Sequence, residues 1–169
     1  CKEFVNEIDL IHKAIYIDNP FIVDELSNYN DLNPMNNLLK DLLTEEKEGV
    51  IEGVIETVRA KEKLNDIYQM LQDVVDGEIL RGKDDEFYLK ISGCDEPIAF
   101  YNLSTGIKSF VILKMLLEKG ALKDKDVVIL DEPEIHLHPQ WQIAYAELIV
   151  LLQKHFDLSV IVTTHSPYF

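Results

Sequence analysis

Basic residues are scarce in this chain of 169 residues, which carries 16 Lys and Arg against 31 Asp and Glu, a net charge of -15. Such a balance repels phosphate backbones, so we expect no nucleic-acid footprint within this chain. Its two cysteines, Cys1 and Cys94, have neither a disulfide framework nor metal-ligand spacing, which favours a reducing, cytoplasmic compartment. Apolar runs are only a handful of residues long, as at 127–130, so we expect no membrane span.

The composition indicates a globular chain, with 47% hydrophobic and 28% charged residues. This length suits one ordinary domain or a lobe of a larger one. Cys1 stands where an initiator Met would, and the chain stops at Phe169 directly after an apolar strand, so we expect both ends to be cut. A lipidated N-terminal Cys is the alternative, but no signal segment accompanies it.

Four regions follow one another along the chain. Residues 1–37 form an N-terminal segment with an apolar patch at 14–17. Residues 38–76 repeat apolar side chains at three- and four-residue spacing, which predicts a helical subdomain or, alternatively, a short coiled coil. Gly49 and Gly53 favour two or three helices over one rod. In residues 77–101, apolar residues alternate with polar neighbours between turn signals, which predicts a β-hairpin region. Residues 102–169 carry the most informative motifs.

The last region predicts a strand, a helix and a second strand. Residues 127–130 are a continuous apolar run, typical of a strand covered on both faces. Pro139 suits the first turn of a helix. Residues 160–162 form the second apolar strand, which a helical crossover makes parallel to the first. We therefore predict an α/β fold with a parallel-sheet core.

Polar residues follow both strands. Asp131 and Glu132 come after the first, and His165 follows the second. Ligands of open parallel sheets bind outside the carboxyl ends of the strands. Nucleotide hydrolysis needs one acid for Mg²⁺, a second for the attacking water, and a polar group at the γ-phosphate. The alternative is that the two acids simply solvate the strand ends.

A third element opens a helix at 102–109. Ser104 or Thr105 can cap it, and Gly106 and Lys108 complete a polar N-terminal turn. Such a terminus can bind an anion. The alternative is an ordinary helix cap.

Together, the order and spacing of these elements resemble the ABC-type ATPases, in the group that includes DNA-repair and SMC-like ATPases. The closest likeness is to the bacterial branch with OLD nucleases and phage-defence ATPases. Residues 103–108 (LSTGIK) resemble the signature motif, 128–133 (VILDEP) the Walker B strand with the catalytic Glu, and 134–139 (EIHLHP) the D-loop. His165 stands at the switch position. The motif-bearing resemblance covers roughly 98–169, and residues 16–21 (YIDNPF) add a faint likeness to that branch.

The resemblance implies a parallel-sheet core of an ABC-type P-loop ATPase, ATP and Mg²⁺ as cofactors, and a homodimer that sandwiches ATP. It implies that Asp131 assists Mg²⁺, Glu132 polarises water and His165 contacts the γ-phosphate. It further implies that the partner's nucleotide is bound in trans at the signature, by Ser104 and Gly106 with Lys108 beside them. A DNA or nuclease/effector partner would bind through other regions.

Three departures from the family pattern qualify this resemblance. Ile107 replaces a usual Gln or Glu, and His138 replaces the Asp of transporter D-loops, which favours the repair and defence branch. The sequence has no G-x-x-x-x-G-K-[ST] phosphate loop, so we expect this chain to be the C-terminal part of the ATPase. The alternative is a non-catalytic partner or regulatory module that retains the ATPase fold.

Two histidines, His136 and His138, lie on one side of the D-loop segment. Zinc ligands sometimes have this spacing, but a zinc site needs three or four of them. We therefore predict a structural or subunit-contact role and no structural metal.

Overall fold

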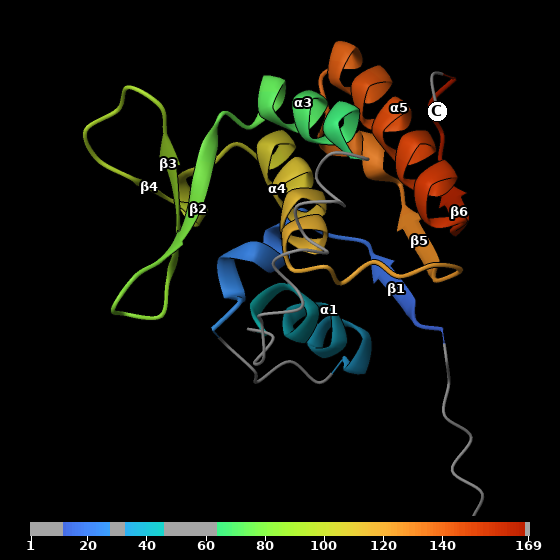
Figure 1. The fold of residues 1–169 in the computed structure, drawn as a ribbon, viewed down its shortest axis with the longest axis horizontal. Coiled ribbons are helices and arrows are strands. Elements are labelled where there is room, and N and C mark those ends of the chain that lie inside the picture. The colour runs from blue at the N-terminus through green and yellow to red at the C-terminus, as the bar shows by residue number, and fades with distance from the viewer. Residues whose placement is uncertain (1–11, 28–32, 46–63, 168–169) are drawn as a thin grey trace, which may run out of the picture.

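The computed structural model describes residues 12–27, 33–45 and 64–167. Its elements, in chain order, are β1 (Ala14–Ile17), η1 (Pro20–Glu25), α1 (Pro34–Thr44), α3 (Asn65–Val74), β2 (Gly77–Arg81), β3 (Phe87–Ile91), β4 (Ile98–Ala99), η2 (Phe100–Asn102), α4 (Thr105–Glu118), β5 (Val127–Asp131), η3 (Pro133–His136), α5 (Pro139–Phe156) and β6 (Ser159–Thr163). Figure 1 shows α4 between two separate sheets.

The core sheet is parallel, in the order β1-β5-β6. The predicted α/β fold with a parallel-sheet core is therefore confirmed. The central strand β5 pairs with β6 so that Asp131 is the register partner of Thr163. The carboxyl ends of β5 and β6 thus lie side by side, which is the arrangement that the strand-helix-strand pattern predicts.

The third strand of this sheet comes from the N-terminal segment. Ile17 of β1 is the register partner of Leu130 of β5, although the sequence separates them by more than a hundred residues. Asp126, which is fully buried, accepts hydrogen bonds from the backbone N–H groups of Lys13 (2.9 Å) and Lys123 (3.0 Å) and so ties the start of β1 to β5. The parallel sheet therefore combines a strand of the N-terminal segment (1–37) with two strands of the last region (102–169). The division into four regions remains a prediction.

The sheet is fully covered on one face only, within the described residues. Val128 and Leu130 are 3% and 0% exposed, whereas Ile129 between them is half-buried. Ile161 of β6 is 53% exposed. The expectation that β5 is covered on both faces is therefore wrong for this part of the chain, because the described helices bury the side chains of alternate strand positions only.

The helix α4 lies at the centre of the described core. Its residues 108–117 are all buried, and Phe110 is 0% exposed. The ring of Phe110 meets Trp141 and Tyr145 of α5 edge-on, at centroid distances of 6.0 and 5.2 Å. As predicted, Pro139 begins α5. The core therefore fixes the start of α4 against the start of α5.

The second sheet is an antiparallel hairpin with a short third strand, in the order β2-β3-β4, as predicted for this region. Figure 1 shows it on the opposite side of α4 from the parallel sheet. The buried Lys114 side chain of α4 donates to the carbonyl of Gly77, which begins β2, and also to the carbonyl of Val75 just after α3, at 3.2 Å. The bond to Val75 satisfies one carbonyl at the end of that helix.

Several predictions about the first half of the chain lie outside the described residues. They concern Cys1 and the break that Gly49 and Gly53 were expected to make in the helical region. Part of the region for which a coiled coil was the alternative also lies outside the described residues. Where the structure describes helices, none is long and apolar enough to cross a membrane.

Candidate functional site

Three of the predicted residues meet at the carboxyl ends of β5 and β6. The Nε2 atom of His165 lies 3.3 Å from Oε1 of Glu132. The His165 side chain is 90% exposed and that of Glu132 38%. Asp131 directly precedes Glu132 at the end of β5. The pair therefore faces solvent at the sheet edge where ligands of parallel sheets bind.

The backbone of Glu132 adopts a left-handed conformation, with φ 45° and ψ 50°. This conformation is unfavourable for a residue with a Cβ and clusters at functional sites. Two hydrogen bonds hold it, because the N–H of Glu132 is bonded to the carbonyl oxygen (2.9 Å) and the hydroxyl oxygen (3.1 Å) of Thr163. The turn lets the chain leave β5 sharply at Glu132.

Two hydroxyl groups hold the Asp131 carboxylate. Thr163 donates to Oδ1, and the phenol of Tyr16 donates to Oδ2 at 2.9 Å. Both bonds lower the pKa of Asp131 below its usual range, and the bond from Thr163 has the larger effect. The Asp131 carboxyl group therefore stays ionised. In turn, the hydrogen bond to Asp131 raises the pKa of the Tyr16 phenol. All three strands of the parallel sheet therefore help to position the Asp131 carboxylate.

Asp131 has the chemistry of a magnesium ligand. It is ionised, its two oxygens are fixed by hydrogen bonds, and each oxygen has a second lone pair. Mg²⁺ is usually bound by one or two carboxylates, with water and substrate phosphates completing the octahedron. A narrow pocket beside Asp131 and Glu132 is also lined by Asp18 and Ser109 and has a volume of about 20 Å³, room for one water molecule.

The start of α4 packs tightly against the D-loop segment. Ser104 is the N-cap, and its hydroxyl accepts from the N–H of Ile107 at 3.4 Å. A Cβ on Gly106 would lie 3.0 Å from the ring of Trp141 and 3.2 Å from the carbonyl oxygen of His136. Packing alone therefore explains a glycine at position 106, independent of any ligand. Ser104 serves as the cap of the helix.

Lys108 is not brought together with the strand-end residues. Its side chain is 2% exposed, and its Nζ lies 2.6 Å from Oδ2 of Asp24 in an ion pair. It also lies 4.9 Å from the centre of the Phe21 ring. A charge enclosed in this way is satisfied within the protein. Its predicted place among the cofactor-binding residues does not fit this geometry.

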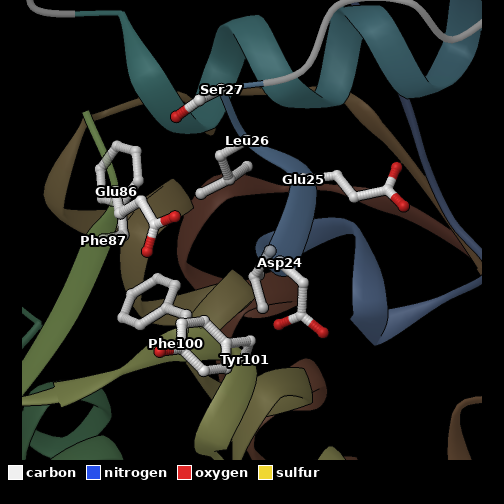
Figure 2. Close-up of a pocket in the computed structure, with 9 residues that line it drawn as sticks. Asp24, Glu25, Leu26, Ser27, Glu86, Phe87, Phe100 and Tyr101 are labelled. Atoms are coloured by element: carbon white, nitrogen blue, oxygen red, sulfur yellow. The ribbon is translucent and has the colours of Figure 1, made fainter. Parts of the chain in front are cut away.

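A second cavity is lined in part by Asp24, the partner of Lys108 in that ion pair. It has a volume of about 260 Å³ and lies between η1, β3 and η2. Figure 2 shows the carboxylate of Asp24 pointing toward Tyr101, with Phe87 and Phe100 across the cavity from it. None of the residues predicted to bind or hydrolyse ATP lines this cavity, so it is separate from the strand-end site.

The D-loop histidines have contacts that need no metal. The ring of His136 meets Phe21 edge-on at 5.9 Å, and Nδ1 of His138 accepts from the N–H of Gln140 at 3.4 Å at the start of α5. Across the described ranges, no three His, Cys, Asp or Glu side chains gather as a metal cluster. That these histidines bind no zinc remains a prediction.

Sequence reasoning did not single out four residues that the structure places around the site: Tyr16, Thr163, Glu134 and Gln142. A tyrosine in an apolar strand and a threonine at a strand end were visible signals. Their partners depend on the strand order, however, which no spacing along the chain reveals.

Gly106 offers a test of the packing at the start of α4. Gly106→Ala places a methyl group against the Trp141 ring, so we expect a loss of about 1–3 kcal/mol in the free energy of unfolding. Urea denaturation measures this. In a Trp141→Phe background the smaller ring should relieve the contact and shrink the loss. An equal loss in both backgrounds would contradict the packing explanation.

Comparison with known proteins decides the family. Residues 11–169, nearly the whole chain, match the AAA ATPase domain family. The chain belongs to this family. The resemblance to ATPases that the motifs indicated is thereby confirmed, and the match includes β1.

Two curated relatives support this assignment. The chain is 37% identical over 100 residues to the Septu protein PtuA of Bacillus thuringiensis, covering 51% of this chain and 24% of the relative. It is 29% identical over 166 residues to the Retron Ec83 probable ATPase of Escherichia coli, covering 78% of this chain and 29% of the relative. The chain thus spans less than a third of the length of either.

Two solved structures are also similar. One is an Smc head domain from Pyrococcus furiosus, with 19% identity, a TM-score of 0.43, and coverage of 68% of this chain and 34% of that one. The other is an ATP-binding cassette bound to ADP and phosphate, with 12% identity, a TM-score of 0.42, and coverage of 92% and 53%. Both TM-scores are below 0.5, so the family assignment depends on the sequence match.

Proposed function

We propose that this chain supplies the hydrolytic residues of an ATPase in which two subunits sandwich ATP. The observation that carries the proposal is the contact of 3.3 Å between Glu132 and His165 at the ends of two adjacent parallel strands. Next to it stands Asp131, whose carboxylate two hydroxyl groups hold ionised. These are the group types that phosphoryl transfer to water requires.

Glu132 orients the attacking water and accepts its proton. The water oxygen forms a bond to the γ-phosphorus while the bond to the bridging oxygen breaks, giving ADP and phosphate. His165 lies beside Glu132 and donates a hydrogen bond to the γ-phosphate. Asp131 would hold Mg²⁺, directly or through water, and the metal would neutralise charge on the phosphates. Groups positioned in this way contribute electrostatic stabilisation where charge develops.

Ser104 and Gly106 bind the nucleotide of the other subunit. They stand at the N-terminus of α4, which carries a partial positive charge. The close approach of Gly106 to the Trp141 ring and the His136 carbonyl fixes this terminus beside the D-loop. Lys108 takes no part, because its ammonium is already paired with Asp24.

The biological process is proposed on resemblance alone. The relatives include a Septu protein and a retron ATPase, and the motifs resemble the defence and repair branch. We therefore place the ATPase cycle in phage defence or DNA repair. A non-catalytic regulatory module is the competing function, and it would bind no ATP productively.

Ser104 provides the test of the sandwich. Ser104→Arg fills the anion site, so hydrolysis by the full-length protein should fall at least tenfold. Two purified heterodimers with different tags separate action in trans from action in cis. One carries Ser104→Arg and Glu132→Gln in different subunits, and the other carries both in the same subunit.

Action in trans predicts about half the wild-type rate when the lesions are in different subunits, because one composite site is then intact. It predicts almost none when they share a subunit. Action in cis predicts the reverse. A wild-type protein that does not hydrolyse ATP would overturn the proposed ATPase and favour the regulatory module.

A further inference from the structure

A buried carboxylate lies behind the loop that carries His165. Glu134 is 6% exposed and follows Pro133 in the D-loop segment. Its Oε1 accepts from the hydroxyl of Thr164 (2.6 Å) and from the backbone N–H groups of His165 (2.7 Å) and Ser166 (3.1 Å). One oxygen therefore holds three consecutive residues just after β6, with His165 in the middle.

The first turns of α5 hold the same loop from a second direction. Gln142 accepts from the hydroxyl of Ser166 at 2.9 Å. Its Nε2 donates to the carbonyl oxygens of Glu134 (3.3 Å) and Leu137 (3.2 Å). Gln142 thus connects the loop of His165 to the D-loop backbone. Together these contacts hold residues 164–166, whose backbone conformation sets where the exposed His165 ring lies.

The charge state of Glu134 fits such a role. Burial raises the pKa of its carboxyl, but the hydrogen bonds from Thr164 and from the His165 and Ser166 amides outweigh it, so the pKa lies below the usual range. A carboxylate accepts charge-assisted hydrogen bonds, which are stronger than neutral ones. Its other oxygen, Oε2, is buried without a hydrogen-bond partner among the described residues. Leaving a buried acceptor unsatisfied is unfavourable, so packing alone does not explain a carboxylate at this position.

We propose that Glu134, supported by Gln142, is a positioning residue for hydrolysis: it fixes the backbone of residues 164–166 so that His165 stays at Glu132. This inference rests on the proposed function. Glu134 does not touch the reacting atoms. Its effect passes through the His165 loop, because its Oε1 binds that loop, whereas the imidazole itself extends into solvent.

Amide hydrogen exchange tests the clamp without ATP. In Glu134→Ala of the full-length protein, the amide of His165 loses its acceptor, so its protection should fall at least tenfold. The Ser166 amide keeps a second acceptor, the hydroxyl oxygen of Thr164 at 3.0 Å, so its protection should fall less. Glu134→Gln retains an acceptor oxygen at Oε1 and should keep most of the protection. Glu147→Ala, which removes an exposed carboxylate elsewhere on α5, is the matched control and should change nothing. Unchanged protection in Glu134→Ala would overturn the proposal.

Steady-state kinetics test the consequence. Glu134→Ala should lower kcat for ATP hydrolysis by roughly 10–100-fold with little change in KM, because the misplaced group acts in the chemical step. Glu134→Gln should restore most of kcat. Lost protection with wild-type kcat would refute the positioning role. If the wild-type protein does not hydrolyse ATP, the proposed function fails, while the exchange result still decides whether the clamp exists. If Glu134→Ala unfolds, Glu134→Gln carries the test, and a low kcat with full protection of the His165 amide would refute the positioning role.

Discussion

Glu132→Gln in the full-length protein should lower the rate of ATP hydrolysis by about 10²-fold or more. The amide keeps the shape of the side chain but cannot accept the proton of the attacking water. The contact to Nε2 of His165 involves one oxygen, Oε1, which the amide can still provide. We therefore expect ATP binding to survive and closed dimers to accumulate with ATP.

Hydrolysis assays and size-exclusion chromatography with ATP measure both outcomes. Glu147→Gln makes the same chemical change on the exposed side of α5 and serves as the control. The position of Glu132 is unusual because its backbone is left-handed, so circular dichroism and a denaturation curve should establish that the variant is folded. A wild-type rate in Glu132→Gln would show that Glu132 is not the acid–base group.

Asp24→Asn should destabilise the fold by about 3 kcal/mol, because it leaves the buried ammonium of Lys108 without its counter-charge. The estimate is at the low end for buried pairs, since the side chain of Asp24 is 21% exposed. The remaining contacts of Lys108, to the Tyr101 carbonyl at 3.5 Å and the Phe21 ring, are weaker. Urea denaturation measures the loss.

A double-mutant cycle with Lys108→Met sharpens this test. If the two residues act as a pair, the double variant should recover much of the stability, because an apolar side chain replaces the unpaired charge. ATP affinity should be the same in Lys108→Met as in the wild type. A fall in affinity with unchanged stability would restore Lys108 to the nucleotide site, as its place in the signature motif first indicated.

The tertiary structure changed the interpretation of the signature motif more than that of the strand ends. Ser104, Gly106 and Lys108 are neighbours in sequence, yet successive helix positions point in different directions. Lys108 therefore points to Asp24 in the core, while Gly106 packs on Trp141 and Ser104 caps the helix. Spacing along the chain predicts a helix start, but not which neighbour each side chain meets.

The sequence by itself determined the unit of β5, α5 and β6 and the edge of the sheet at which Asp131, Glu132 and His165 gather. An apolar run, a Pro-initiated helix and a second apolar run permit little besides two parallel strands with adjacent ends. Only the tertiary structure decided what surrounds them. Tyr16 reaches Asp131 because β1 joins β5 from across the chain, and Glu134 reaches the His165 loop because the D-loop folds back beside β6. Such contacts depend on strand order and loop paths, which arise from packing between distant segments rather than from local pattern.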